Sequence, residues 1–74
     1  MDQETLSLLR LLLARLERIS ADSHVAHRAS GIRGSLLRTV EMLENGWTVS
    51  RSDLRRVIKA GFSILERAAR EKVK

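Results

Sequence analysis

The sequence predicts an all-α protein, a small antiparallel three-helix bundle, and three observations support this class. The 74 residues include no Pro and only four Gly, whereas strands and their turns usually need these residues as punctuation. Leu, Ala, Arg and Glu build much of the chain, and all four favour helices. Apolar residues recur at spacings of three and four, as on one face of a helix. We therefore expect one domain over residues 1–74, near the lower size at which a single core holds a fold.

The first helix is expected over about residues 3–20, with Asp2 as its N-cap. Two adjacent apolar seams cover nearly half of its circumference. The first seam contains Leu6, Leu9, Leu13 and Leu16, and the second contains Leu8, Leu12 and Ile19, with Leu11 on the flank. One seam is enough to pack a helix into a bundle, so the second predicts contact with another chain. We expect self-association, as a dimer or larger homo-oligomer, with an interface formed by Leu8, Leu11, Leu12 and Ile19.

The second helix is expected over about residues 23–44, with an N-cap at Asp22 or Ser23 and closure by Gly46 in the left-handed conformation. Two glycines in the middle of this segment each weaken a helix by about 1 kcal/mol relative to Ala. A break at residues 30–31 is therefore an alternative, which would give four short helices.

The third helix is expected over about residues 51–72, and its start is the most clearly marked boundary of the chain. Ser50 is suited to the N-cap, and Asp53 occupies the capping-box position three residues later. Val49, just before the cap, is placed to pack against Leu54 as a hydrophobic staple.

The segment from Leu36 to Lys59 loosely resembles a helix-turn-helix, with TVSRSDLRRVIK at the position of the recognition helix. Its connection is longer than the usual tight turn, so we carry no DNA-contacting residue over from the resemblance. Trp47 lies in this connection. We interpret it as a lid over the core rather than as a base-stacking side chain.

The residue content argues against catalysis. Without Cys there is no thiol nucleophile, thiolate metal site or disulfide, and we find no nucleophile beside a base and no Gly-rich phosphate loop. His24 and His27 share a helix face but lack a third ligand, and Arg28 beside them would repel a cation. We expect no catalytic residue, no metal, no cofactor and no small-molecule substrate.

The leucine-rich stretch at residues 6–16 is not expected to enter a membrane. Arg10 and Arg15 interrupt it, and it is shorter than the ~20 apolar residues that a span requires. A basic segment typical of a signal peptide does not precede it either. We therefore expect a cytoplasmic protein with no membrane partner.

The charge of the chain favours an anionic partner. The formal net charge is +5, and 11 of the 14 cations are Arg, whose planar guanidinium suits phosphate and carboxylate. A GC-rich genome or a thermophilic host is the alternative explanation of this Arg content.

The positive charge is expected to gather in two places. On the last helix a stripe around Ser63 faces away from the core, with only Glu66 near it; its cations are Arg56, Lys59, Arg67, Arg70 and Lys74. Antiparallel packing also places one pole of the bundle where cations exceed acids by three. The cations of this pole are Arg15, Arg18, Arg28, Arg67, Arg70, Lys72 and Lys74, and its acids are Glu17, Asp22, Glu66 and Glu71.

Two function classes follow from this charge and from the leucine seams. The first is a non-catalytic protein that binds nucleic-acid backbone, with contacts by Arg28, Arg55, Arg56, Lys59, Arg67 and Arg70. Arg28 and Arg55 enter this set because they lie at helix starts, where free amides also attract anions. The second class is an adaptor whose helix 1 meets another protein, with the positive charge serving solubility or an acidic partner.

Overall fold

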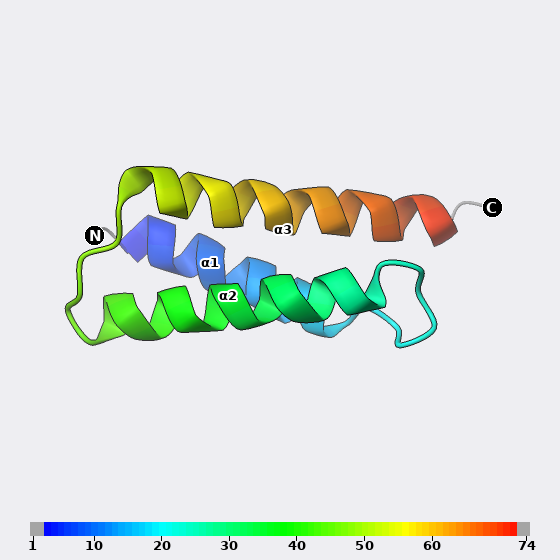
Figure 1. Cartoon of the computed structure of the whole chain (residues 1–74), viewed down its shortest axis with the longest axis horizontal. Helices are drawn as coiled ribbons and strands as arrows, with labels where there is room; N and C mark the ends of the chain where they lie inside the picture. Colours follow the sequence, from blue (N-terminus) through cyan, green and yellow to red (C-terminus); the bar gives the residue numbers. More distant parts are fainter. Residues whose placement is uncertain (1–2, 73–74) are drawn as a thin grey trace.

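Three helices form one elongated bundle. The computed structural model describes residues 3–72, with the side chains of residues 3–71. This part contains α1 (Gln3–Glu17), α2 (Ala26–Glu44) and α3 (Arg51–Lys72) and no strand, within an envelope of 42 × 18 × 16 Å (Figure 1). The helix α2 runs back along α1, and α3 runs forward again in the direction of α1 (Figure 1). The predicted all-α three-helix bundle is confirmed, while the predicted Asp2 cap, Lys74 and the side chain of Lys72 lie outside the described residues.

Aliphatic side chains from all three helices form the core. Its buried members are Leu9, Leu12, Leu16, Val25, Ala29, Leu36, Val40, Leu54 and Ile64. Gly61 of α3 faces α1 and α2, and a Cβ atom there would lie at ordinary van der Waals distance, 3.5 Å from Leu12 Cδ1 and 3.7 Å from Leu36 Cδ1. Gly61 therefore marks a point where α3 packs against α1.

The second leucine seam of α1 is largely covered within the chain. Leu12 is 1% exposed, and Leu8 and Ile19 are half-buried against the core, so only Leu11, at 52%, is mainly exposed. The expectation that Leu12 lies on a free face is wrong. Because α1 packs against both α2 and α3, it needs apolar residues over a wider arc than a helix with one neighbour.

The helix α2 is continuous but starts later than predicted. It begins at Ala26, with Val25 at the N-cap and no side-chain cap, whereas the sequence indicated a cap at Asp22 or Ser23. Likewise α1 ends at Glu17, three residues earlier than expected. The helix runs through Gly31 without interruption, so the alternative of a break at residues 30–31 is wrong.

The connection between α2 and α3 follows the local signals closely. Gly46 has φ +81°, and the two hydrogen bonds of a Schellman motif are present: Trp47 N–H donates to the Met42 carbonyl at 2.9 Å, and Gly46 N–H donates to the Leu43 carbonyl at 3.1 Å. Ser50 Oγ accepts a hydrogen bond from Asp53 N–H at 3.2 Å, as expected of an N-cap. The predicted bounds of the third helix are confirmed.

Candidate functional site

The outer face of α3 is rich in exposed cations. Its exposed basic residues are Arg51, Arg55, Arg56, Lys59, Arg67 and Arg70. The same helix carries three acids, Asp53, Glu66 and Glu71. All five α3 residues predicted to contact phosphate are therefore accessible to solvent.

Two of these cations have partners on α3 itself. Arg56 Nη2 lies 3.9 Å from Asp53 Oδ1, and Arg70 Nη2 lies 2.6 Å from Glu66 Oε1. Pairs one turn apart on an exposed helix contribute only about 0.2–0.5 kcal/mol, so a phosphate can replace either carboxylate at small cost. Within the described part of the chain, Lys59 and Arg67 form no ion pair or hydrogen bond.

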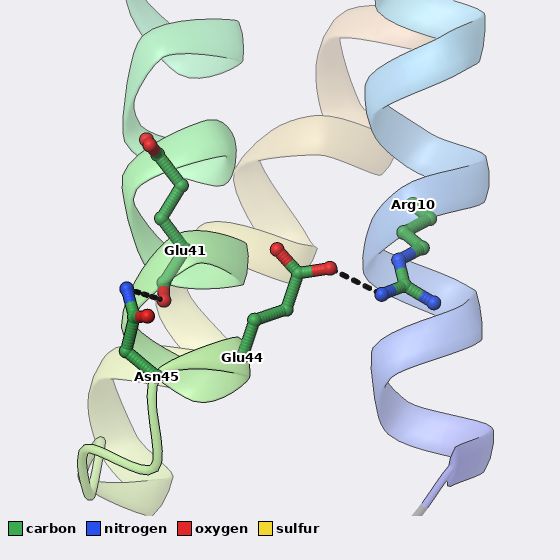
Figure 2. A network of polar contacts seen from close by, with 4 residues as sticks. All are labelled: Arg10, Glu41, Glu44 and Asn45. Atoms are coloured by element: carbon green, nitrogen blue, oxygen red, sulfur yellow. Dashed lines mark hydrogen bonds and ion pairs between the residues drawn. The ribbon is translucent and has the colours of Figure 1, made fainter.

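Two cations of α1 and α2 form ion pairs that join these two helices. Arg10 of α1 reaches across to Glu44 at the end of α2, next to Asn45, whose side-chain amide donates to the Glu41 carbonyl (Figure 2). Further along the same two helices, Arg33 Nη1 lies 4.0 Å from Glu17 Oε2. These pairs join α1 to α2, whereas the ion pairs found on α3 join no second helix. The excess of cations over acids is largest on α3, with six exposed cations and three acids, although Arg15, Arg18, Arg28 and Arg38 of the other segments are also exposed without an ion pair among the described residues.

The three segments of the predicted basic pole lie at the same end of the bundle (Figure 1), and an acid of the chain is hydrogen-bonded between them. The end of α1, the start of α2 and the end of α3 lie together (Figure 1). Glu71 of α3 accepts a hydrogen bond from Ser23 Oγ at 2.7 Å and another from His24 N–H at 3.0 Å. A carboxylate of the chain therefore already lies at the residues that precede α2, where the sequence indicated an external anion. Arg28 is exposed and remains a prediction.

A shallow hollow along the boundary between α1 and α3 was not anticipated. Thr5 of α1 lines one side, and α3 contributes three cations to it: Arg51, Arg55 and Lys59. None of its described lining residues is acidic. Glu4, exposed one residue before Thr5, forms no ion pair with these cations. Arg51 is not among the residues that the sequence predicted to bind nucleic acid.

Both aromatic side chains of the protein are exposed. Trp47 is 65% exposed and Phe62 is 51% exposed, and the sequence has no other Phe, Trp or Tyr. The interpretation of Trp47 as a lid over the core is wrong, because the Schellman turn keeps it at the surface while aliphatic side chains fill the core. Exposed aromatic side chains are available to contact a partner.

Comparisons with protein-family models, curated proteins and solved structures find no match to this chain. Within residues 3–72, none of the helices combines the length and the hydrophobicity needed to cross a bilayer. The described residues also hold no group of three or more His, Asp or Glu side chains placed to bind a metal ion.

Proposed function

We propose that this protein binds the phosphate backbone of nucleic acid without catalysing a reaction. The observation that supports the proposal is the charge of α3, where six exposed cations outnumber three acids. One of those acids, Glu71, is already hydrogen-bonded at the start of α2. A helix surface that merely needs to be soluble usually mixes both signs, so this excess favours a polyanion.

The proposed contacts are electrostatic. Lys59 and Arg67 have no competing partner among the described residues, and Arg56 and Arg70 exchange exposed carboxylates for phosphate oxygens. Arg55 extends this surface towards the start of α3, and Arg28 is a more distant contact on α2. Contacts of this kind position a protein on a backbone without reading base edges, so we expect little sequence preference.

Loss of the four central cations tests this function. We expect replacement of Arg56, Lys59, Arg67 and Arg70 with Gln to weaken binding of a fluorescently labelled oligonucleotide at low salt. A fall of at least about tenfold is expected, because loss of a single charge-assisted hydrogen bond worth roughly 1.5–3 kcal/mol would already lower the affinity by that factor. The measurement is fluorescence anisotropy. Affinity that survives loss of all four cations would remove the proposal.

A matched pair of double variants controls for net charge. Lys59→Gln/Arg67→Gln removes two cations from α3, and Arg10→Gln/Arg33→Gln removes two from the α1–α2 side, where both are paired with Glu. Far-ultraviolet circular dichroism shows whether each variant is folded. We expect the first double variant to lose affinity and the second to retain it, while equal losses would mean that only total charge matters.

Self-association through α1 is the second candidate function. Exposed Leu11 and half-buried Leu8 favour it, but Leu12 is enclosed by its own chain and unavailable to a partner. Sedimentation equilibrium of the wild-type protein and of Leu11→Glu tests this candidate. A wild-type monomer, or a dimer that Leu11→Glu leaves intact, would argue against the α1 interface.

A further inference from the structure

The positions of the two aromatic side chains indicate which form of nucleic acid fits the protein. A small domain with few aromatic residues normally uses them in its core, where they bury large areas. Here both remain at the surface, and both lie near the cations of α3 in the sequence: Trp47 precedes Arg51 by four residues, and Phe62 follows Lys59 by three.

Helix geometry places the cations and Phe62 on one flank of α3. Arg51, Arg55 and Lys59 recur at every fourth residue, which spaces them about 6 Å apart along the helix. Phe62, three residues beyond Lys59, continues the same flank, about 16 Å from Arg51 along the axis. The three cations line the hollow between α3 and Thr5 of α1. A strand lying in this hollow would therefore meet three cations and then an aromatic ring.

The contact between α1 and α3 indicates on which side of the bundle Phe62 projects. Leu12 packs against Gly61, and the two helices run in the same direction (Figure 1). In parallel helices, the residue before one contact residue and the residue after the other project to the same side. Leu11 and Phe62 therefore project to the same side, away from α2, and each is about half exposed, at 52% and 51%.

We propose that the nucleic acid is single-stranded, with bases stacked on Phe62 and Trp47 and phosphates held by Arg51, Arg55 and Lys59. This inference rests on the proposed function and specifies its substrate. Every unpaired base offers a flat face to an aromatic ring, whereas a duplex keeps its bases stacked inside. Cations without acidic neighbours beside an exposed ring are the combination that recurs in proteins binding single strands without sequence preference.

Docking of a protein on this surface is less favoured. The exposed halves of Leu11 and Phe62 together offer on the order of 200 Å² of apolar surface, while a stable interface buries about 800 Å² on each partner. If a second copy of this chain docked with the same surface, the cations of that copy would approach Arg51, Arg55 and Lys59 of the first copy.

The test compares three anionic probes that differ in their bases. They are a labelled single-stranded oligothymidine of about 12 nucleotides, the duplex of equal length, and polyphosphate, which carries the charge without any base. Direct titration is followed by anisotropy for the first two, and competition reports on polyphosphate. We expect the single strand to bind about tenfold more tightly than the duplex. Emission of Trp47, the only Trp of the protein, should be quenched by the single strand and not by polyphosphate.

Phe62→Leu removes the aromatic ring and keeps an apolar side chain beside Leu11. We expect this variant to bind the single strand about tenfold more weakly and to bind polyphosphate as the wild type does. Leu37→Ala is the matched control, because Leu37 is 48% exposed on α2 and should leave every affinity unchanged. Arg51→Gln/Arg55→Gln/Lys59→Gln should weaken binding of all three probes.

The outcomes separate this inference from the function it rests on. If single strand and duplex bind equally and Phe62→Leu changes neither affinity, stacking is refuted while backbone binding stands. If none of the probes binds at low salt, the proposed function fails and the inference fails with it. Unchanged Trp47 emission on saturation with oligothymidine would remove Trp47 from the stacking surface.

Discussion

Replacement of the two central glycines of α2 with Ala should stabilise the protein. Neither Gly31 nor Gly34 has any atom within 4 Å of the position that a Cβ would occupy, and neither has a positive φ. Both lie inside a continuous helix, where Gly is less stable than Ala by about 0.5–1 kcal/mol. The double variant should therefore gain about 1–2 kcal/mol in free energy of unfolding, provided that nothing else approaches these positions.

Thermal unfolding followed by circular dichroism measures this gain. For a domain of this size each kcal/mol raises the melting temperature by about 4–8 °C, so the double variant should melt roughly 5–15 °C higher. Gly46→Ala is the control, because φ +81° at Gly46 makes any Cβ unfavourable by about 1 kcal/mol, and its melting temperature should fall. A lower melting temperature for the Gly31→Ala/Gly34→Ala variant would refute the reasoning and would show that α2 is irregular there or packs against another backbone.

Three further substitutions test contacts that hold the bundle together. Leu12→Ala should reduce the free energy of unfolding by about 2–5 kcal/mol, whereas Leu11→Ala should change it by less than about 1 kcal/mol; similar values in urea unfolding would contradict the assignment of Leu12 to the core. Glu71→Ala should reduce it by about 1.5–3 kcal/mol, since two partly exposed hydrogen bonds of a carboxylate to the segment before α2 are lost, and unchanged stability would mean that these bonds do not matter in solution. Arg10→Gln should change it by less than about 1 kcal/mol, because its pair with Glu44 is exposed; a larger loss would show that this pair anchors α1 to α2.

The parts of the fold predicted correctly are those whose signals are local. Ser50 caps α3 and Gly46 closes α2 because the cap and the left-handed turn depend on residues within a few positions of each other. The predicted start of α2 was too early, and the segment before α2 has a hydrogen-bond partner that is distant in the sequence. Glu71, 47 residues after His24, accepts the hydrogen bonds of the segment before α2, and no local pattern shows that.

The leucines of α1 illustrate a second limit. Helical periodicity shows how many apolar residues share a face, but it does not show how many helices cover that face. Leu12 was assigned to an interface because one seam seemed sufficient for packing. In the structure Leu12 is covered by its own chain, and its side chain lies beside Gly61 of α3. Gly61 could be connected with Leu12 only once the packing of the helices was known.

For the candidate site, the sequence predicted the exposed cations of α3 but not the hollow beside them. Arg56, Lys59, Arg67 and Arg70 are exposed as expected, because their positions follow from the spacing of a single helix. The hollow lined by Arg51 depends on how α1 and α3 are aligned. The exposure of Phe62 depends on the same alignment, although the presence of only two aromatic residues in the chain was a usable signal.

The most direct test of backbone binding through α3 is the salt dependence of the affinity for nucleic acid. Each phosphate contact releases counterions, and the slope of log affinity against log salt changes by about 0.9 per contact on a duplex and about 0.7 on a single strand. If α3 binds the backbone, the slope should be shallower for Lys59→Gln/Arg67→Gln and unchanged for Arg10→Gln/Arg33→Gln. Equal slopes for the wild type and the Lys59→Gln/Arg67→Gln variant would contradict backbone binding through α3.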